Sequence, residues 1–108
     1  MYQDLASPAV PPLVLGAVEL ARRFDFTYTV HPMTGRLLAA LAGGIRGTIG
    51  ETGTGTGASV GWMLSTAPPE TSIVSVEVDD DRAKAAADLF RNERQVTILS
   101  ADANELAE

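Results

Sequence analysis

The chain has 108 residues, 45% hydrophobic and 20% charged, which fits one globular domain and excludes a disordered or fibrous chain. It has no cysteine, which excludes disulfides, thiolate nucleophiles and cysteine-ligated zinc and predicts a reducing compartment, the cytoplasm. The net charge is −6, and residues 55–108 carry ten acidic and four basic side chains, which argues against binding to nucleic acid or to an anionic membrane.

The first part of the chain predicts two helices. Between residues 10 and 24, apolar residues recur at helical spacing. An extended connection over residues 25–33 leads to a second helix at about 34–41, which ends before two consecutive glycines. No basic region precedes the apolar stretch of the first helix, so we do not expect a signal peptide.

From residue 47 onward, the pattern alternates between strands and helices. Alternating elements of these lengths predict a parallel sheet with right-handed crossovers. The fold class is therefore α/β, a Rossmann-like three-layer parallel sheet preceded by two helices. The expected strands are 47–51, 72–78 and 95–100. One helix is expected to start near residue 58, a second to span about 81–92 and a short third one to lie within 102–108.

A glycine-rich segment, Glu51-Thr52-Gly53-Thr54-Gly55-Thr56-Gly57, joins the first strand to the helix after it. Open parallel sheets bind ligands at this end of the strands, and glycines let the backbone turn sharply and approach a ligand closely. The start of the next helix favours a nucleotide-like cofactor. The alternative is a helix-entry loop that uses glycine for geometry alone.

The residues around this segment fit two classes of cofactor. Glycines 53 and 55 with Ala58 satisfy a loose dinucleotide fingerprint, and Glu77 follows at the distance expected of an acid that holds a ribose. Glu51 favours a cationic ligand instead, because a carboxylate there would repel a pyrophosphate. Asp102 ends the third strand, where it can accept a hydrogen bond from an exocyclic amine.

Residues 47–108 resemble the first half of a class I S-adenosylmethionine-dependent methyltransferase, in particular the small bacterial O-methyltransferases. The glycine-rich segment matches the first motif of that family, residues 74–79 match the second and residues 100–103 look like the third. The lead-in at residues 31–38 also resembles the helix before the sheet in bacterial members, whose turn covers the cofactor.

The resemblance implies that S-adenosylmethionine (SAM) is the cofactor. It implies that Glu77 hydrogen-bonds both ribose hydroxyls, that Asp102 accepts from the adenine amino group and that Ser59 holds the methionine carboxylate. The backbone at residues 52–53 would line the methionine portion. The predicted cofactor-binding residues are Glu51, Thr52, Gly53, Thr54, Gly55, Gly57, Ser59, Glu77, Val78, Asp102 and Ala103.

The match stops where the fourth strand of the family's seven-stranded sheet would begin. We therefore expect residues 1–108 to form a single, apparently truncated SAM-binding domain. No catalytic residue, general base or metal ligand is predicted. The predicted function is O-methyl transfer to a small-molecule acceptor. One alternative is non-catalytic binding of SAM or S-adenosylhomocysteine (SAH) by a chain that needs a partner or a C-terminal half. The other is binding of a nicotinamide dinucleotide. A first strand left as a sheet edge also predicts a homo-oligomer, such as a dimer.

Four further features are predicted to be structural. His31 precedes a proline as in a turn, and residues 79–81 have the composition of a helix N-terminus. Trp62 is predicted to be a packing residue. Arg82 and the other basic residues of the helices are expected on solvated helix faces.

Overall fold

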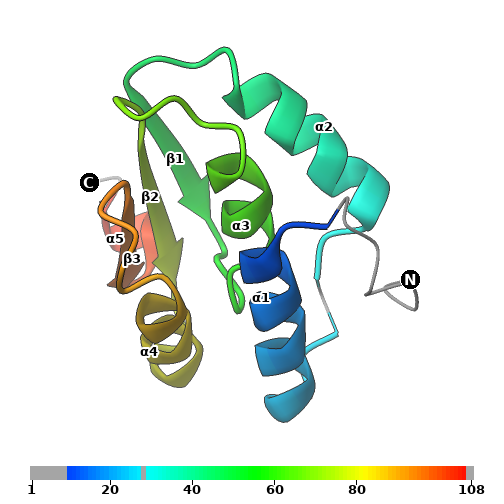
Figure 1. The fold of residues 1–108 in the computed structure, drawn as a ribbon. Helices are drawn as coiled ribbons and strands as arrows, with labels where there is room; N and C mark the ends of the chain where they lie inside the picture. The colour runs from blue at the N-terminus through cyan, green and yellow to red at the C-terminus, as the bar shows by residue number, and fades with distance from the viewer. Residues whose placement is uncertain (1–9, 28, 107–108) are drawn as a thin grey trace.

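Three parallel strands form the sheet, in the order β1-β2-β3. The structure is a computed structural model that describes residues 10–27 and 29–106. Its strands are β1 (Thr48–Thr52), β2 (Ser72–Glu77) and β3 (Val96–Ser100), and β2 lies between the other two (Figure 1). The predicted α/β fold with a parallel sheet is confirmed, and every strand lies within one residue of its predicted limits.

The predicted helices are also present. They are α1 (Pro12–Arg23), α2 (Pro32–Ala42), α3 (Ala58–Leu64), α4 (Asp80–Leu89) and α5 (Ala103–Leu106). The segment predicted at residues 102–108 extends beyond the described residues, which end at 106. Within the described part of the chain, no helix has the length and apolar character needed to cross a membrane.

Helix α2 begins two residues before its predicted start because two neighbouring residues favour a helix terminus. Pro32 occupies the first helical position, where its missing N–H costs nothing. The Nδ1 atom of His31 accepts a hydrogen bond from the N–H of Met33 at 3.1 Å and so caps the helix. The structural role predicted for His31 is confirmed.

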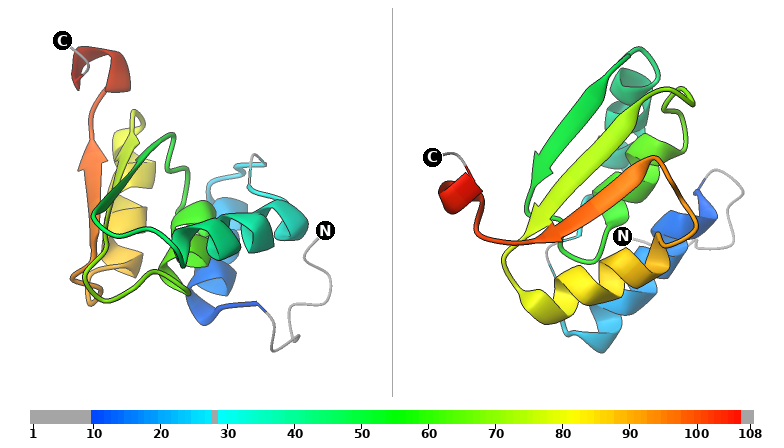
Figure 2. Two further views of the ribbon diagram at one scale, coloured as in Figure 1. Left: turned by 90° about the horizontal axis from the view of Figure 1, so that it is seen from above. Right: turned by 90° about the vertical axis from the view of Figure 1, so that its left-hand side faces the viewer.

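The described helices α1 to α4 lie on one side of the sheet (Figure 2). Helices α3 and α4 contact the strands, and α1 and α2 pack on the outside of α3. Burial alternates along β2: Ile73, Ser75 and Glu77 are buried, whereas Val74 and Val76 are only partly buried. This period of two is the pattern of a strand with one covered face.

Trp62 joins the outer helices to the inner one. Its side chain is 2% exposed and belongs to a cluster with Val14 of α1 and Ala39 of α2. A Cβ atom at Gly35 would lie 2.3 Å from the Trp62 Nε1, so α2 can approach the indole this closely only with glycine at that position. The packing role predicted for Trp62 is confirmed, and this cluster fixes the chain segment that leads from α1 to α2.

Candidate functional site

The glycine loop, residues 53–57, connects β1 to α3 in a backbone shape that requires glycine. Gly55 and Gly57 have φ angles of +59° and +105°, in the left-handed region that L side chains rarely adopt. A Cβ at Gly55 would lie 2.7 Å from the Phe26 ring, and one at Gly57 would lie 2.6 Å from the Phe90 ring. The loop therefore packs too closely against two aromatic rings to accept side chains at these positions.

Strand β2 holds the loop through hydrogen bonds. The N–H groups of Gly53 and Thr54 donate to the carbonyl oxygen of Val76 at 2.7 and 3.2 Å. The N–H of Gly55 donates to the Oε1 atom of Glu77 at 2.8 Å. The first part of the loop is thus fixed to the end of the central strand by three successive N–H groups.

The carboxylate of Glu77 is buried at the carboxyl end of β2. The residue is 3% exposed, and its Oε2 atom accepts from the N–H of Asp79 at 2.9 Å and from the Nη2 of Arg82 at 3.2 Å. Asp79 in turn caps α4, because its Oδ1 accepts from the N–H of Arg82 at 2.9 Å. The capping role predicted for residues 79–81 is confirmed at Asp79, and Glu77 connects the cap to the glycine loop.

The prediction that Arg82 lies on a solvated helix face was wrong. Its side chain is 27% exposed, pairs with Glu77 and places its guanidinium 4.6 Å from the centroid of the Phe26 ring. Arg82 is in the first turn of α4, and this geometry brings its side chain back toward the end of β2. The buried carboxylate attracts the guanidinium away from solvent.

A second carboxylate, that of Glu51, lies at the end of β1 among hydroxyl groups. Its Oε2 accepts from the Ser59 hydroxyl, and its Oε1 accepts from the Ser75 hydroxyl at 2.6 Å. Thr54 Oγ1 lies 2.6 Å from Ser75 Oγ, and Thr54 is the donor there because the Ser75 proton is used toward Glu51. Burial raises the pKa of Glu51 above its ordinary value, and the two serine hydrogen bonds partly oppose that rise.

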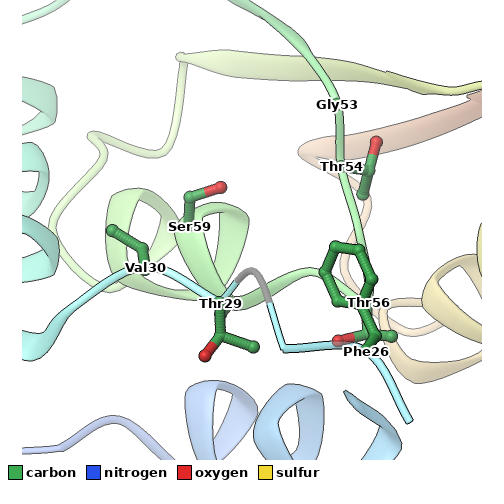
Figure 3. A pocket seen from close by; sticks show the side chains of 8 residues that line it. Phe26, Thr29, Val30, Gly53, Thr54, Thr56 and Ser59 are labelled. Atoms are coloured by element: carbon green, nitrogen blue, oxygen red, sulfur yellow. The ribbon is translucent and has the colours of Figure 1, made fainter. Parts of the chain in front are cut away.

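A pocket of about 410 Å³ lies between the glycine loop and the segment that joins α1 to α2 (Figure 3). Figure 3 shows Phe26, Thr29 and Val30 on the joining segment, with the loop and Ser59 of α3 opposite. No sequence motif predicts a role for those three residues, because only the packing of α1 and α2 on α3 brings them to the loop. The lining residues are Phe26, Thr29, Val30, Gly53, Thr54, Thr56, Ala58 and Ser59.

Among the described residues that line this pocket, none has a titratable side chain. His31, the one histidine of the sequence, caps α2 instead. Over residues 10–27 and 29–106, no three histidine, aspartate or glutamate side chains come together as a candidate metal site. The pocket is therefore suited to binding by hydroxyl groups, backbone and apolar surface.

Val78 and the turn that holds Asp102 lie at the same end of the sheet as Glu77. Val78 is 69% exposed. The N–H of Ala101 donates to the carbonyl oxygen of Glu77 at 3.0 Å, which places the turn after β3 beside the end of β2. The Oδ1 of Asp102 accepts from the N–H of Asn104 at 2.9 Å at the start of α5.

The predicted site residues thus divide into two sets around one end of the sheet. Those that line the pocket are Gly53, Thr54 and Ser59. Those that lie in or beside the loop and the strand ends without lining it are Glu51, Thr52, Gly55, Gly57, Glu77, Val78, Asp102 and Ala103.

Comparison with known proteins identifies the fold. No protein-family model and no curated protein matches the chain. The O-methyltransferase TomG from Streptomyces achromogenes, involved in tomaymycin synthesis and solved in complex with SAM, is 26% identical. It matches with a TM-score of 0.78 over 88% of this chain and 45% of its own.

Two further solved structures have the same fold. The O-methyltransferase from Bacillus cereus in complex with SAH is 20% identical, with a TM-score of 0.74 over 88% of this chain and 46% of that one. A protein from Corynebacterium glutamicum is 21% identical, with a TM-score of 0.79 over 97% and 51%. The predicted resemblance in fold to SAM-dependent O-methyltransferases is confirmed, and the chain spans about half the length of these structures.

The environment of Glu51 predicts a change in stability with pH. Because its pKa is raised in the folded chain, the folded state holds this proton above the ordinary value of 4.5, where the unfolded state has lost it. The Glu51 contribution to the free energy of unfolding is therefore fully present below pH 4.5 and is lost as pH rises through the folded pKa. The Glu51→Gln variant lacks this loss, so its stability relative to the native chain should increase with pH.

Urea unfolding followed by Trp62 fluorescence, between about pH 4 and about pH 8, measures this difference. A difference between variant and native chain that stays constant over this range, or that decreases with pH, would contradict the effect assigned to burial of Glu51.

Proposed function

We propose that this chain binds SAM and forms, as one domain, the cofactor-binding half of an O-methyltransferase that acts on a small-molecule acceptor. The observation that carries the proposal is the glycine loop held against the buried carboxylate of Glu77 at the end of β2. This arrangement occurs in a fold shared with an O-methyltransferase solved in complex with SAM. Ligands of open parallel sheets bind at this end of the strands.

The residues at the carboxyl ends of β1, β2 and β3 match the successive parts of SAM: methionine, ribose and adenine. Ser59 and the loop backbone at Gly53 would hold the methionine portion, next to the pocket that both residues line. Glu77 would accept from the ribose, while Val78 and Asp102 on the adjoining strand ends would contact the adenine. Bound SAM supplies a methyl group on a sulfonium for in-line transfer, and these residues would contribute alignment.

A second candidate function is non-catalytic binding of SAM or SAH by this chain alone. The described lining residues favour it, because none of their side chains is a base that could accept a proton from an acceptor hydroxyl. A nicotinamide dinucleotide fits less well, because the Glu51 carboxylate lies directly before the loop that would receive a pyrophosphate.

Since the chain has no cysteine, we propose the cytoplasm as its location.

Calorimetric titration with SAM, SAH and NAD tests the cofactor assignment. We expect SAH to bind with micromolar or better affinity and NAD to give no comparable signal. In the Glu77→Gln variant the affinity for SAH should fall by about tenfold or more, because a hydrogen bond to a charged acceptor contributes about 1.5–3 kcal/mol.

The matched control is Asp81→Asn, which removes one carboxylate charge from the exposed first turn of α4. This variant should bind SAH as the native chain does. Equal affinity of Glu77→Gln and the native chain for SAH would contradict the assignment of Glu77 to the ribose. Tighter binding of NAD than of SAH would contradict the assignment of SAM as the cofactor.

The 108-residue chain should bind the cofactor without methylating catechol or other simple phenols. Alignment of cofactor without an oriented acceptor and a base gives little rate. Formation of SAH from SAM in the presence of catechol measures turnover. Turnover by the purified chain that is lost in Gly55→Val, where the added side chain would meet Phe26, would contradict this expectation.

We also propose that the chain forms a two-fold homodimer through β1 and α2. Met33, Leu37 and Leu41 lie four residues apart on one face of α2 and are 74%, 59% and 58% exposed. Strand β1 is an edge of the described sheet, and a cavity of about 320 Å³ lies between it and α2. An open edge beside exposed apolar side chains favours pairing with a second copy.

Light scattering of the native chain at low micromolar concentration should report twice the monomer mass. The Leu37→Glu variant should report a monomer, because it places a charge in the proposed interface. The control Ala87→Glu adds the same charge at an exposed position on α4 and should leave the dimer intact. A monomeric native chain would contradict the proposal.

A further inference from the structure

We propose that Arg82 competes with the cofactor ribose for the carboxylate of Glu77 and thereby sets the affinity of the site for a ribose diol. The inference rests on the proposed function, because it concerns how the ribose reaches Glu77. In the structure that carboxylate is already occupied, and the residue is 3% exposed. A ligand that hydrogen-bonds Glu77 through two hydroxyls must therefore displace one of the donors already there.

The number of acceptor sites on Glu77 limits what can bind at once. A carboxylate offers about four lone-pair sites, two on each oxygen. The N–H of Asp79 and the Nη2 of Arg82 take both sites of Oε2, and the N–H of Gly55 takes one of Oε1. One site remains, so Glu77 can accept from both hydroxyls of a ribose only after one of these donors leaves.

Arg82 is the donor that can leave. The N–H of Asp79 is fixed by the helix cap, since the carbonyl of that residue accepts from Ala83 at 2.9 Å. The N–H of Gly55 belongs to a loop closed by the hydrogen bond from Gly57 to Thr54 at 3.1 Å. Both are backbone groups, whereas the Arg82 contact is made by a side chain and is the longest of the three, at 3.2 Å.

Phe26 connects the Arg82 side chain to the pocket. Its ring lines the pocket, and the guanidinium of Arg82 lies 4.6 Å from the ring centroid. The Nε atom of Arg82 is buried there and makes no hydrogen bond within the described part of the chain. Arg82 thus covers Glu77 at a cost, the buried and unsatisfied Nε, that its departure would remove.

The test compares the affinities of the native chain and Arg82→Gln for SAH and for 2′-deoxy-SAH by calorimetry. Removing the competing cation should tighten SAH binding by about tenfold, because the ligand no longer displaces a charge-assisted hydrogen bond. The gain should be smaller for 2′-deoxy-SAH, which presents one hydroxyl to Glu77. Arg82→Lys, which keeps the charge without the planar guanidinium, should fall between Arg82→Gln and the native chain and replaces Arg82→Gln if that variant does not fold.

The matched control is Arg91→Gln, which removes an exposed arginine just after α4 and should leave both affinities unchanged. Equal or weaker SAH binding in Arg82→Gln, or an equal gain for both ligands, would overturn the competition. If the native chain binds SAH and the variant gains nothing, this inference alone fails. If neither chain binds SAH, the proposed function fails with it.

A measurement on the native chain gives an independent readout. The buried Nε–H of Arg82 should exchange slowly with solvent in the absence of ligand, and saturation with SAH should accelerate its exchange in NMR spectra. An Nε–H that stays protected when SAH is bound would show that Arg82 keeps its place on Glu77 and would overturn the inference.

Discussion

Burial of the Glu77 carboxylate is the constraint on which the rest of the site depends. An isolated carboxylate in the interior is strongly destabilising unless donors compensate it. Here the donors come from two separate segments: the glycine loop supplies the N–H of Gly55, and the start of α4 supplies the N–H of Asp79 and the side chain of Arg82. Because donors from both segments converge on one carboxylate, the loop and the start of α4 are held in a fixed relation to the end of β2.

Strand register explains why the second carboxylate lies in the same place without sharing those donors. Glu51 of β1 pairs with Ser75 of β2, two residues before Glu77, so its side chain meets the Ser75 hydroxyl on the covered face of the sheet. Ser59 at the start of α3 completes its contacts. Among the described residues this carboxylate has hydroxyl donors and no cationic partner, and burial raises its pKa. The two glutamates thus have different hydrogen-bond partners because different elements surround them.

The local patterns of the sequence predicted the elements, because hydrophobic period, glycine and proline act within a few residues. They also predicted the loop and the acids at the strand ends. They did not predict that Arg82 turns back to Glu77, since this depends on how α4 follows β2, nor that Phe26 reaches the loop. The segment from α1 to α2 alternates only briefly between polar and apolar residues, and the packing of Trp62 among α1, α2 and α3 decides its position.

The same contacts that stabilise the site oppose the binding of a ligand to Glu77. Arg82 compensates the charge of Glu77 and lies over the Phe26 ring, so the guanidinium supplies hydrogen bonding that, in the proposed function, a ribose would supply. A ligand gains only the difference between its own contacts and those it displaces. Removing the carboxylate would relieve this opposition but would also release the N–H of Gly55 that holds the loop. A buried acid with one displaceable side-chain donor keeps the loop ordered while leaving the acceptor within reach of a ligand.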